Sequence, residues 1–348
     1  MDGVLLGLRA SRVPALLVVT WLLAAGPARA SQNGDEKERL AREFIASLGQ
    51  KEWLRAIEIG RSLKELDPEN EIVDYNLACA YARAAKADEA IQSLRAAAKS
   101  GFSDADHLTA DADLESVRAH AEFAAIVERV RKNHEQAREE FERKVEQSEP
   151  LIVIPGTVTA DRPAPVVVAL HPYGGTAETI AARWRKLAAD RGAILVAPRA
   201  VLATGKGFQW GTVDQADRIV TRALERVRKL HPVDDKCIFL TGFSQGAFMA
   251  YGLGLRHAAT FRGVIPMAGE WNPAAAALPK EPPAERPRFY IMVGDKDPAL
   301  ESNKQAALDL RGAGFVTQLK VFENLTHEFP PDADAELEQA LRFCMGEE

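Results

Sequence analysis

Residues 240–246 (LTGFSQG) restrict the fold of this chain more than any other stretch. An apolar run at 237–240 leads into a G-x-S-x-G sequence centred on Ser244, and a helix-forming segment, AFMAYGLGL, follows. A strand that enters a helix through so tight a turn needs glycines on both sides of the serine, because a Cβ atom there would clash with the neighbouring backbone. Since chance alone supplies such a motif in about one chain in ten of this length, its meaning depends on what accompanies it.

The composition and the charge of the chain set broad limits. With 348 residues, 47% of them hydrophobic and 27% charged, the chain is long enough for two globular domains. Its net charge of -6 argues against a nucleic-acid partner, which would require a clustered basic surface. The three cysteines, Cys79, Cys237 and Cys344, have neither the spacing of a metal site nor that of a disulfide framework. We therefore expect no metal site and no binding of nucleic acid.

The first thirty residues differ in character from the rest of the chain. Arg9 and Arg12 precede an apolar run at 13–25, and the sequence GPARA then provides an A-x-A cleavage site that ends at Ala30. An uncleaved membrane anchor is the alternative, but this run is short for a bilayer span of about twenty residues. We therefore predict a signal peptide at 1–30 with cleavage after Ala30. The mature protein would be secreted or periplasmic, with no stable membrane span.

Residues 31–130 carry almost no strand signal and are predicted to be helical. Alanine, leucine and charged residues dominate, and apolar residues recur at helical spacing. Four positions align with four others 34 residues later: Ala56 with Ala90, Gly60 with Leu94, Leu63 with Ala97, and Pro68 with Phe102. This spacing is the tetratricopeptide period. The segment resembles a pair of tetratricopeptide repeats.

Two roles are open for these predicted repeats. A stack of helix pairs commonly holds a peptide or protein partner on its concave face, which would make the segment a docking module. The alternative is a structural appendage that fixes the rest of the chain in an assembly or a dimer. Residues 131–149 follow with mixed charges at three- and four-residue spacing, which supports an exposed helix. We interpret them as a charged helical connector.

From residue 150 to residue 348, short β-branched runs alternate with amphipathic helices. The predicted strands are 151–158, 166–170, 194–197, 237–240, 264–267, 289–293 and 317–322, and the predicted helices are 176–191, 213–230, 245–257, 302–312 and 333–344. Strands that are buried on both faces and separated by helices form a mostly parallel sheet in a doubly wound α/β fold. The active site of such a fold lies at the carboxyl ends of the strands.

Partners for Ser244 follow later in the chain. Asp295 and Asp297 come directly after the sixth predicted strand, and His327 is the single histidine beyond them. A serine hydroxyl becomes an effective nucleophile when a base takes its proton, and a carboxylate holds that base in the required tautomer. We therefore predict Ser244 as the nucleophile and His327 as the base. Asp297 is the preferred acid because it stands three residues after Gly294, and Asp295 is the alternative.

Four motifs carry a resemblance to a known family: LHPYGG, LTGFSQGAFMAY, VGDKDPAL and LTHEFP, in that order. From about residue 151 to its end, the chain resembles the α/β-hydrolase superfamily, and within it the phospholipase/carboxylesterase and polyhydroxybutyrate-depolymerase-like serine esterases. The order Ser244, Asp297, His327 is that of the α/β-hydrolase triad. The resemblance implies a serine carboxylic-ester hydrolase that works through an acyl-enzyme.

An anionic intermediate in such a reaction needs backbone donors. The amide of Gln245 is one expected donor, because it begins the helix after the serine and gains from the helix dipole. By the resemblance, the second donor of this oxyanion hole is the amide of Tyr173 in the HPYGG loop, where the fold usually shows a His-Gly pair. Pro172 departs from that pattern and has no N–H to donate.

Four aromatic residues in loops at the expected catalytic edge are candidates for a substrate pocket: Phe208, Trp210, Phe243 and Trp271. Together they would form an apolar acyl or aryl pocket. Ordinary core packing is the alternative for each of them. The alanine- and proline-rich run at 272–287 is predicted to be a surface loop.

These observations favour an exported serine hydrolase that cleaves carboxylic esters, either of small molecules or of a polymer, without a metal or an organic cofactor. A peptidase on the same fold is one alternative. The other is a repeat-containing binding protein whose hydrolase domain is catalytically silent, although such domains usually lack a triad residue.

Overall fold

The computed structural model describes residues 32–159, 161–274, 278–279 and 286–347. These residues form two compact units, which divide between Glu140 and Phe141, inside helix α6 (Phe123–Gln147). The predicted signal peptide and its cleavage site after Ala30 lie outside the described residues. Within the described part, every helix is too short or too polar to cross a lipid bilayer.

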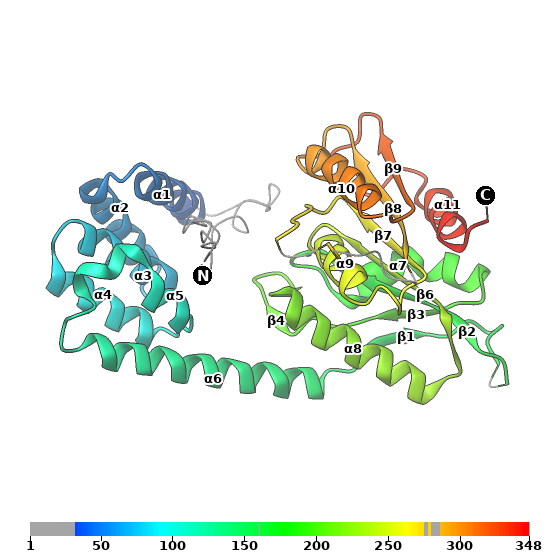
Figure 1. Cartoon of the computed structure of the whole chain (residues 1–348), viewed down its shortest axis with the longest axis horizontal. Coiled ribbons are helices and arrows are strands. Elements are labelled where there is room, and N and C mark those ends of the chain that lie inside the picture. Colours follow the sequence, from blue (N-terminus) through cyan, green and yellow to red (C-terminus); the bar gives the residue numbers. More distant parts are fainter. Residues whose placement is uncertain (1–31, 160, 275–277, 280–285, 348) are drawn as a thin grey trace, which may run out of the picture. The chain divides into compact units, whose positions relative to one another are not determined.

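The first unit consists of helices that pack against their neighbours in sequence (Figure 1). They are α1 (Gln32–Gly49), α2 (Trp53–Leu66), α3 (Glu71–Arg83), α4 (Ala87–Lys99), α5 (Ala105–Ala110), a short 3₁₀ helix, η2 (Ala112–Val117), and the first part of α6. The buried amide of Asn133 on α6 donates to the carbonyls of Ala98 (2.7 Å) and Phe102 (2.8 Å), which fixes α6 against the end of α4. The predicted helical character of this segment is confirmed, whereas its assignment as tetratricopeptide repeats stays a prediction.

A seven-stranded sheet organises the second unit (Figure 1). In spatial order its strands are β1 (Leu151–Val153), β3 (Ile194–Ala197), β2 (Ala164–Leu170), β6 (Val233–Phe243), β7 (Gly263–Met267), β8 (Arg288–Gly294) and β9 (Thr317–Phe322). Every neighbouring pair in this sheet is parallel except β1 and β3. The predicted doubly wound, mostly parallel α/β fold is confirmed.

Helices cover both faces of this sheet. They are α7 (Ala177–Asp190), α8 (Val213–Leu230), α9 (Gln245–Arg256), α10 (Leu300–Gly312) and α11 (Ala333–Met345). Val166 and Val168 of β2 belong to the core shared with α8, α9 and α10, whereas Val167 and Ala169 belong to a second core with α7 and α11. Because successive side chains point to opposite faces and both faces are covered, the strand appears in the sequence as a continuous apolar run.

Two strands, β1 and β6, differ from the prediction by more than two residues in length. β1 ends at Val153 rather than at residue 158, because the chain turns at Pro155, whose carbonyl accepts from the Val158 amide (3.0 Å). β6 begins four residues before the predicted start, and its first residues include the exposed Asp235 and Lys236. An exposed polar start to a strand carries no apolar signal in the sequence.

Candidate active site

Ser244 connects β6 to α9 in a backbone conformation that L-amino acids rarely adopt, with φ of 55° and ψ of -117°. Its amide donates to the carbonyl of Met267 on β7 (2.9 Å), and its own carbonyl accepts from the amides of Ala247 and Phe248. Such a conformation costs about 1–3 kcal/mol and persists only where the surrounding structure fixes it. The turn presents the serine at the carboxyl end of β6, where it is half-buried.

Gly242 and Gly246 permit this turn because they have no side chains. A Cβ atom on Gly242 would lie 2.2 Å from the carbonyl oxygen of Gly246, and one on Gly246 would lie 2.3 Å from the carbonyl oxygen of Leu170. Both distances are far below ordinary van der Waals contact, and both obstacles are backbone atoms. The glycine requirement of the motif therefore has a direct steric cause in this chain.

The Gly246→Ala variant is expected to lose roughly 3 kcal/mol of stability, or to fail to fold, because the added methyl group would push β2 away from α9. Gly312→Ala is the matched control, since a Cβ atom at this last residue of α10 would meet nothing within 4 Å. It should be neutral, or stabilising by up to about 1 kcal/mol. Urea unfolding measures both. Equal stability of the two variants would contradict the steric argument.

Asp297 follows β8 and is held rigidly. Its side chain is almost fully buried, and one carboxylate oxygen accepts from the amide of Ala299 (2.8 Å). The other oxygen lies 2.9 Å from Nδ1 of His327. Asp295 is exposed to solvent, and its amide donates to the carbonyl of Phe322 on β9 (2.9 Å). Of the two predicted candidates for the acid, the structure brings Asp297 to the histidine.

His327 lies in the loop between β9 and α11 and joins the aspartate to the serine. Its Nε2 lies 2.9 Å from the Oγ of Ser244. Because an ionised carboxylate only accepts hydrogen bonds, the bond to Asp297 places the imidazole proton on Nδ1 and leaves Nε2 as an acceptor for the serine hydroxyl. The Lys296 amide donates to the carbonyl of Leu325 (3.0 Å), which ties the loop of Asp297 to the loop of His327.

The HPYGG loop after β2 is braced by a small hairpin that the sequence interpretation missed, β4 (Leu202–Ala203) and β5 (Phe208–Gln209). The Gly174 amide donates to the Phe208 carbonyl (2.9 Å), and the Phe208 amide donates to the Gly175 carbonyl (3.1 Å). Tyr173, the predicted oxyanion donor, stands between Pro172 and Gly174 in this loop and is exposed to solvent. The other predicted donor, Gln245, is the first residue of α9.

His171 begins this loop as a buried, neutral residue. Its Nδ1 donates to the carbonyl of Pro172 (2.8 Å), and burial lowers the pKa of its imidazole. The carbonyl of His171 accepts from the indole N–H of Trp210 (2.8 Å). These contacts are those of a residue that shapes the loop.

A model of the dienelactone hydrolase family matches residues 152–342, which is more than half of the chain. The chain belongs to the dienelactone hydrolase family. It is therefore an enzyme of a hydrolase family, and the predicted relationship to the α/β-hydrolase superfamily is confirmed. The comparison with curated proteins found no match.

Solved structures similar to this dienelactone hydrolase family member include several esterases. Esterase PE8 is 22% identical with a TM-score of 0.47, and the match covers 56% of this chain and 99% of that one. An uncharacterized protein from Bacillus cereus ATCC 10987 is 19% identical with a TM-score of 0.48, covering 89% of this chain and 99% of that one. An S-formylglutathione hydrolase from Agrobacterium tumefaciens is 17% identical with a TM-score of 0.44, covering 55% and 88%.

Two of the predicted pocket residues of this hydrolase lie in its hydrophobic core. Trp210 is fully buried, and its indole N–H is already bonded to His171. Trp271 is buried too, and its indole N–H donates to Asp309 of α10 (2.7 Å). Trp271 follows β7 of the central sheet and Trp210 follows β5 of the hairpin, but both side chains are buried and hydrogen-bonded. Trp210 and Trp271 are therefore core residues rather than the predicted pocket residues.

The other two predicted pocket residues differ in exposure. Phe208 is 39% exposed, whereas Phe243 is buried in the core shared with α7 and α11, and its ring lies 5.1 Å from the ring of His327 between centroids. Phe329, which the sequence interpretation missed, stacks on Phe243 at 4.5 Å, and the guanidinium of Arg183 lies 4.9 Å from the Phe329 centroid. These rings support one side of His327. The sequence signal that could have indicated Phe329 is its position, two residues after His327 in the same loop.

Proposed function

We propose that this hydrolase cleaves carboxylic esters through an acyl-enzyme formed on Ser244. The observation that carries the proposal is the hydrogen-bonded series of Ser244, His327 and Asp297, with both distances at 2.9 Å. This is the geometry that a serine nucleophile, its base and the acid that orients the base require. The family name supports the substrate class, since a lactone is a cyclic ester.

In the proposed reaction, the Oγ of Ser244 attacks the ester carbonyl carbon while Nε2 of His327 takes the hydroxyl proton. The tetrahedral intermediate collapses when the carbon–oxygen bond to the alcohol breaks, and His327 returns the proton to that alcohol. Water then attacks the acyl-enzyme with His327 as base, which releases the acid and restores the serine. Asp297 stabilises the imidazolium in both steps.

The intermediate carries a negative charge on the former carbonyl oxygen, and we propose the amides of Gln245 and Tyr173 as its donors. The position of Gln245 at the start of α9 supports the first assignment, because the amino end of a helix favours negative charge. The glycines of the HPYGG loop, which allow close approach of the backbone, support the second.

The rest of the chain is assigned by sequence. We propose that residues 1–30 are a signal peptide and that the mature protein starts at Ser31; mass spectrometry of its N-terminus tests this. We also propose a tetratricopeptide-like segment at 31–130, a connector at 131–149 and a catalytic domain at 150–348. The helical segment keeps two proposed roles, and light scattering separates them: a dimer favours the assembly role and a monomer favours docking of a protein or peptide.

Hydrolysis of matched substrates tests the esterase assignment. We expect turnover of a short-chain p-nitrophenyl ester, because p-nitrophenolate is a good leaving group that departs without help from a proton donor. A peptidyl p-nitroanilide should be cleaved far more slowly. Faster cleavage of the anilide would favour the peptidase, and no cleavage of either by the folded protein would favour a catalytically silent binding protein.

A further inference from the structure

The second unit contains a cavity of about 420 Å³, and His171 of the HPYGG loop is one of its lining residues. Its apolar lining comes from the start of α7 and from the segment after β3, at Ala177, Ala200, Val201, Ala203 and Phe208. The volume lies in the range of about 300–1,000 Å³ that small-molecule sites occupy. The polar residues of the lining include Glu178 and Arg199, which form an ion pair with each other (2.5 Å), so the apolar residues favour a hydrocarbon group over a charged one.

Hydrogen bonds connect the wall of the cavity to the candidate active site. Phe208 lines the cavity and exchanges backbone hydrogen bonds with Gly174 and Gly175 of the HPYGG loop. Two residues later, the amide of Trp210 donates to the side-chain oxygen of Gln245 (3.2 Å), the residue next to Ser244. A group in the cavity would therefore lie against the same loop that is proposed to hold the oxyanion.

The end of α6 supplies a further wall of this cavity through Lys144, Gln147 and Ser148. This wall is anchored in the hydrolase unit, because Phe141 and Val145 of the same helix are buried in the core shared with α8. Val145 is only 1% exposed. The last turns of α6 are therefore part of the packed hydrolase unit.

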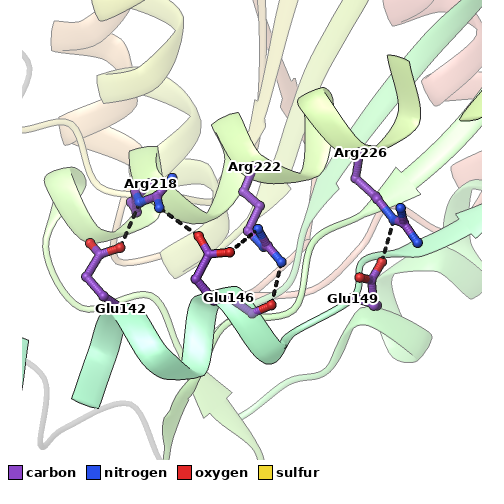
Figure 2. A network of polar contacts seen from close by, with 6 residues as sticks. All are labelled: Glu142, Glu146, Glu149, Arg218, Arg222 and Arg226. Carbon is purple, nitrogen blue, oxygen red and sulfur yellow. Dashed lines mark hydrogen bonds and ion pairs between the residues drawn. The ribbon is translucent and has the colours of Figure 1, made fainter. Parts of the chain in front are cut away.

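Ion pairs fix the position of the same helix end. Figure 2 shows three arginines, spaced four residues apart on α8, that face three glutamates at the end of α6 and just after it: Arg218 with Glu142 and Glu146 (both 2.9 Å), Arg222 with Glu146 (2.6 Å), and Arg226 with Glu149 (2.7 Å). These pairs range from partly exposed to exposed, and each contributes about 1 kcal/mol or less. Their main effect is on geometry, since a row of ion pairs selects one register of α6 against α8.

We propose that this cavity binds an apolar chain or ring of the ester substrate, so that the end of α6 takes part in substrate selection. The inference rests on the proposed esterase function. Each methylene group that moves from water into the cavity should raise kcat/KM by up to about fourfold. The preference for longer substrates should therefore depend on residues of α6 as well as on residues after β3.

Two cavity-filling variants test this inference. Ala203→Trp fills the cavity from β4, and Ser148→Trp fills it from the chain after α6. Ala182→Trp is the control, because Ala182 is exposed on α7 and does not line the cavity. Each protein is assayed with p-nitrophenyl esters from acetate to octanoate and, separately, with acetate esters of alcohols from ethanol to octanol. Thermal unfolding checks that each variant is folded.

We expect the ratio of kcat/KM for the longest and the shortest substrate to fall at least about tenfold in both cavity variants and to stay unchanged in Ala182→Trp. A fall in the first series assigns the cavity to the acyl group, and a fall in the second assigns it to the alcohol. Unchanged ratios in both series would overturn the proposal, and an unchanged ratio in Ser148→Trp alone would overturn the part played by α6. Failure of the wild-type protein to hydrolyse any ester would instead contradict the proposed function.

Discussion

Replacement of Ser244 by alanine is expected to lower kcat for ester hydrolysis by at least about 10⁴-fold, because the attacking oxygen is removed. Stability should change little. Alanine keeps the Cβ atom, so the unusual φ of 55° is equally strained in both proteins, and the amide bond to Met267 is retained. Initial rates with a p-nitrophenyl ester, together with thermal unfolding, measure both effects.

Ser62→Ala is the control for this variant, because Ser62 lies exposed on α2, outside the hydrolase unit. It should keep wild-type activity. If Ser244→Ala retained more than about one hundredth of the wild-type rate, a role as the nucleophile would be untenable.

The second large effect is expected from Asp297→Asn, which should lower kcat by roughly 10⁴-fold. An asparagine can present its NH₂ group to Nδ1 of His327, which moves the imidazole proton to Nε2. That tautomer cannot take the proton of Ser244. The buried position of Asp297 excludes water as a replacement acceptor, which makes the loss large.

Asp295→Asn is the matched control, since the same chemical change is made two residues away on an exposed side chain. We expect its kcat to remain within about twofold of the wild-type value, as for other exposed substitutions. A large loss in Asp295→Asn combined with a small loss in Asp297→Asn would reverse the assignment of the acid.

The fold could be predicted from the sequence where an element has a clear pattern along its full length. β3 is a buried apolar run, β9 carries β-branched and aromatic residues among polar ones, and α8 has helical periodicity, and all three have the predicted bounds. The hairpin of β4 and β5 has strands of two residues, which are too short to show any period. The start of β6 was predicted too late because Asp234, Asp235 and Lys236 near its beginning carry no apolar signal.

For the candidate site, the types of the residues and their order along the chain could be predicted from the sequence. Spacing alone left Asp295 and Asp297 as alternatives, and the hydrogen bonds that separate them depend on how the loop folds after β8. The sequence does not show in which direction a side chain points. For this reason Trp210 and Trp271 were predicted to line a pocket, whereas the structure has them buried.

The contribution of α6 could not be predicted for a different reason. Residues 131–149 have the composition of an exposed, charged helix, and the sequence shows nothing of their partners. Their glutamates meet arginines of α8 that lie 72–77 positions later in the chain. Pairings between residues so far apart in sequence are set by the fold. Residues that the sequence indicates as a connector therefore line a cavity in the structure.

Covalent labelling with a fluorophosphonate probe tests the central claim, that Ser244 is a nucleophile activated by His327. Peptide mass spectrometry of the labelled wild-type protein should find the phosphonyl group on Ser244, and labelling should be lost in Ser244→Ala and strongly slowed in His327→Ala. A folded wild-type protein that remains unlabelled, or that carries the label on another residue, would contradict this account of the enzyme.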